Sequence, residues 1–103
     1  MSGAELPRAA TLLASGEWAP IPGCPGRWRL RGPASPVGPA ELLGVDPARV
    51  ARERSPRARD EVLILPLLDG GLISYRRPDG AHVHTLGDAA GFARKLRQLR
   101  GED

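Results

Sequence analysis

The sequence predicts a small α+β domain in which a three- to four-stranded, mostly antiparallel sheet packs against a C-terminal helix. Two observations favour this fold: three extended segments follow one another over residues 61–86, and an amphipathic helix with a good N-cap follows at 88–100. A chain of 103 residues has the length of one domain. We therefore expect residues 1–103 to fold as one unit, with flexible ends at 1–4 and 101–103.

The strand predicted at 61–68 is a continuous apolar run that is too short for a globular helix. It ends at Asp69 and two glycines, which supply the positive φ angles that a two-residue hairpin turn requires. Because both of its faces are apolar, this strand is expected inside the sheet. Its neighbours would be the strand predicted at 71–77 and a further strand at 26–31.

The strand predicted at 71–77 ends in a Pro-Asp-Gly turn, in which proline presets φ and glycine takes the left-handed conformation that follows. Pairing of Arg77 with Ala81 across this turn would start the last strand, 81–86. Alternation then gives an apolar face and a polar face, and the polar face carries Ser74, Arg76, His82 and His84. We expect strand 81–86 to be a sheet edge that can pair with a protein partner or a second copy of the chain.

The helix predicted at 88–100 begins at Asp88, whose carboxylate can accept hydrogen bonds from the next amides and interact favourably with the helix dipole. Its apolar stripe is expected to pack on the sheet and consists of Ala89, Phe92, Leu96 and Leu99.

The first half of the chain is less regular. It has a short helix after Pro7 and a proline-rich connector, which Trp18 is expected to anchor to the core.

The middle segment, Ala40 to Arg54, reads AELLGVDPARVARER. It predicts a short helix that ends in Leu-Gly-Val and a second helix that Asp46 caps. The segment resembles the core of a helix-turn-helix, and the order of elements resembles a winged-helix layout. This resemblance implies DNA binding through a recognition helix whose outer face would carry Ala48, Arg49, Arg52 and Glu53.

The net charge of +3 suggests nucleic-acid binding, but the composition of the basic residues weakens this inference. Fourteen of the fifteen basic residues are Arg and Asn is absent, which is typical of a GC-rich genome whatever the function. Arginines that form one surface would be more informative, with an affinity that falls steeply with salt. Alternation in the strand at 26–31 places Arg27, Arg29 and Arg31 on its outer face. The candidate nucleic-acid surface consists of Arg29, Arg31, Arg49, Arg52 and Arg97.

His82 and His84 are the other candidates for chemistry, since residues i and i+2 of a strand project from one face about 7 Å apart. Both imidazoles could reach one metal ion, but the sequence offers no obvious third ligand, so we predict no metal and no cofactor. Ser74 opposite His84 resembles a nucleophile and its base. With Arg76, which offers bidentate donors to phosphate or carboxylate, these side chains suit an anionic ligand.

No stretch forms a catalytic signature, so the leading expectation is a small non-catalytic binding or regulatory module for a protein partner or an anionic ligand. Nucleic-acid binding through residues 40–54 is the first alternative, and a small metal-dependent or hydrolytic enzyme that uses His82 and His84 is the second. No apolar run approaches the roughly 20 residues that cross a bilayer, and the N-terminus lacks the pattern of a secretory signal. We expect a cytoplasmic protein with no membrane partner, in which the single Cys24 is a small buried residue.

Overall fold

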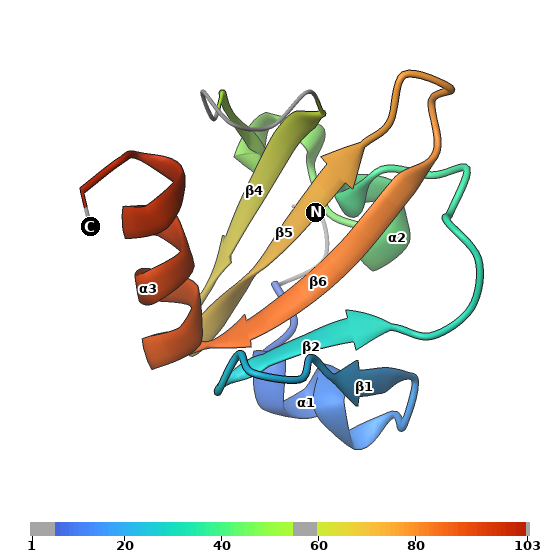
Figure 1. Ribbon diagram of the computed structural model, residues 1–103. Helices are drawn as coiled ribbons and strands as arrows, with labels where there is room; N and C mark the ends of the chain where they lie inside the picture. Colours follow the sequence, from blue (N-terminus) through green and yellow to red (C-terminus); the bar gives the residue numbers. More distant parts are fainter. Residues whose placement is uncertain (1–5, 55–59, 103) are drawn as a thin grey trace.

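The computed structural model describes residues 6–54 and 60–102, which form a six-stranded antiparallel sheet with three α-helices (Figure 1). The strands are β1 (Trp18–Pro20), β2 (Arg27–Leu30), β3 (Ala51–Glu53), β4 (Glu61–Leu67), β5 (Gly70–Arg76) and β6 (His82–Asp88). Their order in the sheet is β1-β2-β6-β5-β4-β3. The helices are α1 (Ala9–Ala14), α2 (Pro39–Leu43) and α3 (Ala89–Leu99), and a single 3-10 turn, η1, covers Pro47–Arg49.

The sheet is wider than predicted because a three-residue strand is added at each edge. The α+β class, the four predicted strands and the C-terminal helix are all present. The sequence of the additional strands β1 and β3 does not predict them. β1 lies in a proline-rich connector, and β3 reads Ala-Arg-Glu, none of which is enriched in strands. Pairing with a neighbour, rather than local propensity, makes these two segments extended.

The strand order corrects two expectations. β6 was predicted as an edge at 81–86, but it lies inside the sheet between β2 and β5, and β2 pairs with β6 instead of β4. Further along the outer side of β6, the N–H and C=O of Ser35 each form a 2.7 Å hydrogen bond with the backbone of His82. Strand 81–86 is therefore not a free edge of the described sheet, which removes the basis for expecting a second copy to pair with it.

Both predicted hairpins are present, and the first turns one residue earlier than predicted. Leu67 pairs with Gly70, so Leu68 and Asp69 form the β4–β5 turn. Gly70 has a φ of 155°, and a Cβ at this position would lie 2.0 Å from the carbonyl oxygen of Gly87 in β6. Glycine is needed at position 70 because β6 passes so close to it.

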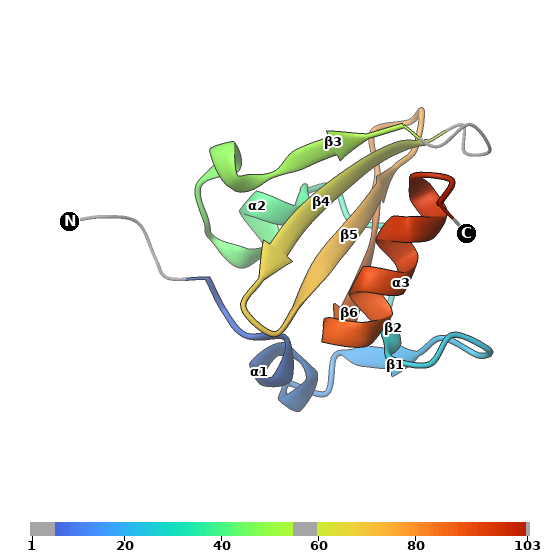
Figure 2. The same ribbon diagram turned by 90° about the vertical axis from the view of Figure 1, so that its left-hand side faces the viewer.

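Helices cover both faces of the sheet (Figure 2). The helix α3 packs on one face, over a core that comprises Val62, Ile64, Ile73, Phe92 and Leu99. The second face lies under α1 and α2, and its core includes Ala9, Trp18, Ala40, Leu65, Leu72 and Leu86. Asp88 caps α3 as predicted, since its Oδ1 accepts a 2.8 Å hydrogen bond from the N–H of Gly91.

The helix α1 is capped by a residue from a distant turn. None of its own side chains caps its N-terminus, and Asp69 accepts hydrogen bonds there from the N–H groups of Ala9 (2.7 Å) and Ala10 (3.2 Å). The Ala9 hydrogen bond, followed by that of Ala10, holds the pKa of Asp69 below its ordinary value. Because the partners are about sixty positions apart, no local sequence pattern indicates this cap.

The middle segment 40–54 is not a helix-turn-helix. Asp46 does cap the turn that follows it, accepting from the N–H of Ala48 at 2.9 Å, but that turn is the three-residue η1. The backbone becomes extended at Val50 and continues into β3, which pairs with β4. Since Arg49 lies on a 3-10 turn and Arg52 on a strand, they do not share the outer face of a recognition helix.

The two ends predicted to be flexible lie partly outside the described residues, which exclude 1–4 and 103. At the C-terminal end, the N–H of Gly101 donates to the carbonyl of Gln98 (3.2 Å) and that of Glu102 to the carbonyl of Arg97 (2.9 Å). Residues 101 and 102 therefore complete the end of α3. Among the helices in the described ranges, none has both the length and the apolar character to span a membrane.

Candidate functional site

The four polar residues predicted to share one face do so, but at different depths. Pairing of β5 with β6 places Ser74 opposite His84 and Arg76 opposite His82. Ser74 and His84 are 0% and 2% exposed, His82 is also buried, and Arg76 is exposed. Residues of the segment 34–38 contact His82 and His84, so this part of the polar face lies under irregular chain, while Arg76 faces solvent.

Ser74 and His84 form a buried hydrogen-bonded network. The Nε2 of His84 lies 3.0 Å from the carbonyl oxygen of Val37, which can only accept, so this nitrogen carries the hydrogen. In the neutral ring Nδ1 is then the acceptor, and the Ser74 hydroxyl donates to it at 2.6 Å. Burial lowers the pKa of His84, which favours this neutral ring. Both groups are inaccessible to a substrate, so the network fixes the segment around Val37 over the sheet.

The buried His84 should make stability depend on pH. Its folded-state pKa is lowered from the ordinary value of 6.5, so the unfolded chain binds more protons below that pH. Above about pH 6.5, protonation of His84 does not reduce the free energy of unfolding. Below that pH, the free energy of unfolding falls as pH drops toward the lowered pKa, by at most about 1.4 kcal/mol per pH unit. Urea unfolding at pH 7.5 and 5.5 should show this loss, and His84→Leu should reduce it. An equal loss in both proteins would assign it to other groups.

A cleft of about 590 Å³ opens on the same face, at the end of the sheet nearest the β5–β6 turn. We name it the Glu61 cleft. Its polar lining consists of Glu41, Arg52, Glu61, Arg76 and His82. Its apolar walls come from the segment before α2, from η1 and from the sheet, and include Pro36, Val37, Pro39, Pro47, Val50 and Leu63. Two carboxylates and two guanidinium groups balance the charge of this lining.

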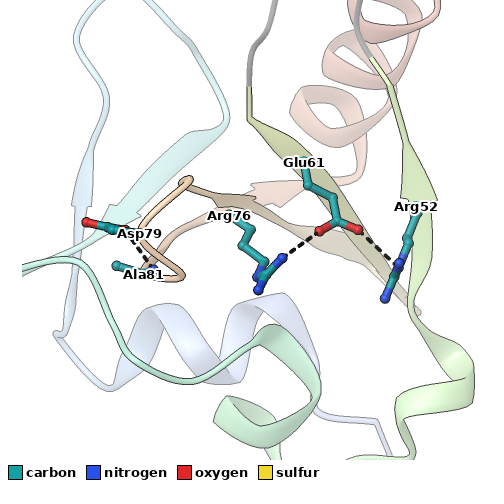
Figure 3. A network of polar contacts seen from close by, with 5 residues as sticks. All are labelled: Arg52, Glu61, Arg76, Asp79 and Ala81. Carbon is teal, nitrogen blue, oxygen red and sulfur yellow. Dashed lines mark hydrogen bonds and ion pairs between the residues drawn. The ribbon is translucent and has the colours of Figure 1, made fainter.

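Glu61 lies between two arginines in this cleft, as Figure 3 shows. Its Oε1 is 3.1 Å from Nε of Arg52, and its Oε2 is 3.4 Å from Nη1 of Arg76. The side chains of Arg52 and Arg76 are 78% and 52% exposed. Ion pairs this exposed are weak, so either arginine can exchange Glu61 for another carboxylate at little cost.

His82 occupies the inner wall of the Glu61 cleft. Its ring stacks parallel to that of His84, with 5.8 Å between the ring centroids, and its Nδ1 is buried with no hydrogen-bond partner among the described residues. Gly38 separates it from Glu41: a Cβ at position 38 would lie 3.6 Å from Cε1 of His82 and 2.8 Å from Oε2 of Glu41. Over residues 6–54 and 60–102, no group of three or more His, Cys, Asp or Glu side chains could hold a metal ion.

The five arginines predicted as a nucleic-acid surface are exposed but dispersed. Arg29 lies on β2 and Arg31 just beyond it, while Arg49 and Arg52 lie on η1 and β3. Three strands separate β2 from β3, which corresponds to roughly 19 Å across the sheet. Arg97 lies on α3. This distribution does not favour a single continuous arginine surface.

No protein-family model, curated protein or solved structure matches this chain.

Two residues lie elsewhere than the sequence suggested. Arg27 was expected to face solvent with Arg29, but it is 6% exposed, because α3 and the turn before β2 meet over that end of the strand. Only the position of α3 distinguishes the two arginines, so no local pattern would have identified Arg27. Cys24 was expected to be buried and is exposed in the turn before β2.

Proposed function

We propose that this protein is a small non-catalytic binding module that takes up a carboxylate group in the Glu61 cleft. The observation that carries the proposal is the convergence of Arg52 and Arg76 on one carboxylate, that of Glu61, beside an apolar wall. Guanidinium groups match the geometry of a carboxylate and present several N–H donors to it. A ligand carboxylate that replaced Glu61 would find both arginines already in place.

The rest of the lining indicates the kind of molecule that would carry this carboxylate. Because two acidic and two arginine side chains balance, a monoanion suits the cleft better than a dianion. The prolines, Val37, Val50 and Leu63 offer apolar contact for the body of the ligand. An extended peptide with one acidic side chain combines these properties. Such a ligand is consistent with the expectation of a protein partner or an anionic ligand.

Glu61 competes with such a ligand, and this gives the proposal a distinctive test. Glu61→Gln keeps the size of the side chain but releases both arginines, so we expect a capped peptide with one Glu to bind about tenfold more tightly. Arg76→Gln removes a ligand contact and should weaken binding by about tenfold. Fluorescence anisotropy with a labelled peptide measures both effects.

Two controls separate binding in the cleft from general attraction to a basic protein. The same peptide with Gln in place of Glu should bind neither variant measurably. Arg77→Gln removes the same charge one residue beyond Arg76, at an exposed position that does not line the cleft. Equal losses for Arg76→Gln and Arg77→Gln, or no gain for Glu61→Gln, would count against the proposal.

A further inference from the structure

Arg27 is a buried guanidinium without a counter-ion on the opposite face of the sheet. Its Nη2 donates to the hydroxyl of Thr85, which in turn donates to the carbonyl of Ile73 at 2.9 Å. The N–H groups on Nε and Nη1 are shielded from water and have no acceptor in the described part of the chain. No carboxylate among those residues forms an ion pair with Arg27.

Such a group is unfavourable in the ligand-free protein. A buried charge lowers stability unless an opposite charge and hydrogen-bond acceptors compensate for lost hydration. Thr85 provides one neutral acceptor and no charge. An anion next to Arg27 would therefore gain an interaction that no described side chain provides.

A cavity of about 240 Å³, which we name the Arg27 pocket, has Arg27 among its lining residues. It lies between the turn before β2, the sheet and α3. Its lining includes two further cations, Arg94 and Lys95, and contains no acidic residue. Tyr75 forms part of its wall, with Nζ of Lys95 at 5.9 Å from the centre of the Tyr75 ring. The charge in this pocket is uncompensated, in contrast to the Glu61 cleft.

Direct contacts between the turn and α3 hold the walls of the pocket in place. Nη1 of Arg94 donates to the carbonyl of Pro25 at 3.0 Å. Gly91 lies so close to Gly26 that a Cβ on Gly91 would be 2.3 Å from the Gly26 carbonyl oxygen. A ligand would thus enter a pocket that is already formed, which reduces the conformational entropy lost on binding.

We infer that the Arg27 pocket binds the phosphate group of a small ligand, either inorganic phosphate or a small phosphomonoester. Three cations with no acid favour a dianion, and charge-assisted hydrogen bonds to phosphate are strong. The volume is several times that of one water molecule in the liquid, about 30 Å³. It leaves room for a phosphate and a small organic group beside Tyr75.

Thermal unfolding in the presence of inorganic phosphate, phenyl phosphate or acetate, each at an ionic strength matched with sodium chloride, tests the inference. The wild-type midpoint should rise saturably with phosphate and not with acetate or chloride. Arg27→Met should abolish the response. Arg29→Met is the matched control, since Arg29 is exposed on the same strand and carries the same charge, and it should respond like the wild type.

The two phosphate compounds distinguish the sources of the ligand. A response to phenyl phosphate at lower concentration than inorganic phosphate would assign the site to a phosphomonoester, and an equal response would assign it to phosphate alone. No response to either, an unchanged response in Arg27→Met, or an equal loss in Arg29→Met would overturn the inference. If Arg27→Met does not fold, Lys95→Met provides the test: phosphate should bind about tenfold more weakly, and unchanged affinity would contradict the site.

Discussion

Arg27→Met is expected to make the ligand-free protein more stable, although it removes the hydrogen bond to Thr85. Methionine is an unbranched side chain whose Sδ would take the place of the Arg27 Cδ beside Gly87, and it removes a charge with two unpartnered nitrogens. Replacement of buried charged groups by well-packed apolar ones is often stabilising, and we expect a gain of about 1–2 kcal/mol. In a domain of this size, each kcal/mol of added stability raises the melting temperature by about 4–8 °C.

Urea unfolding at pH 7 in a phosphate-free buffer measures this effect. Arg29→Met removes the same charge from an exposed position and should change the free energy of unfolding by less than about 0.5 kcal/mol. A loss of stability in Arg27→Met would show that the guanidinium has favourable partners in solution. The case for a vacant anion site at Arg27 would then fail.

Gly91→Ala is expected to destabilise the protein, although alanine is the better helix former. Helix propensity alone predicts a gain of up to about 1 kcal/mol. A Cβ at position 91, however, would lie 2.3 Å from the carbonyl oxygen and 2.7 Å from the carbonyl carbon of Gly26. Backbone atoms cannot rotate away, so α3 and the turn before β2 must separate, at a net cost of about 1–3 kcal/mol.

The sign of this change is decisive, because the two effects oppose each other. Urea unfolding should show a lower free energy of unfolding for Gly91→Ala, together with a weaker response to phosphate as the Arg27 pocket opens. Ala93→Gly, at an exposed position of the same helix, isolates the propensity term and should cost about 1 kcal/mol. A stabilised Gly91→Ala protein would contradict the close contact between α3 and Gly26.

The strongest local signals correctly predicted the centre of the fold. The apolar run of β4, the Pro-Asp-Gly turn before β6 and the cap at Asp88 each act over a few residues, so the sequence expresses them directly. The edge strands β1 and β3 and the position of β6 depend on which segments meet in space. β6 was expected at an edge because strand 26–31 was expected beside β4, and nothing local shows that β2 pairs with β6 instead.

The candidate sites divide in the same way. Strand alternation was enough to place Arg76 and His82 on one face. Arg52 joins them through β3, which was expected to be helical, and this is why Glu61 and its two arginines were not foreseen as one group. Arg27 follows the same alternation as Arg29, and only the covering helix α3 makes it a buried group with a different role.

The most direct test of these binding sites is an NMR titration that follows the arginine Nε–Hε signals of the wild-type protein. With the capped Glu peptide, we expect the signals of Arg52 and Arg76 to shift while that of Arg27 does not. With inorganic phosphate, we expect Arg27 to shift and the other two to stay in place. Shifts spread evenly over exposed arginines such as Arg29 and Arg31, for either ligand, would show surface attraction alone and contradict both sites.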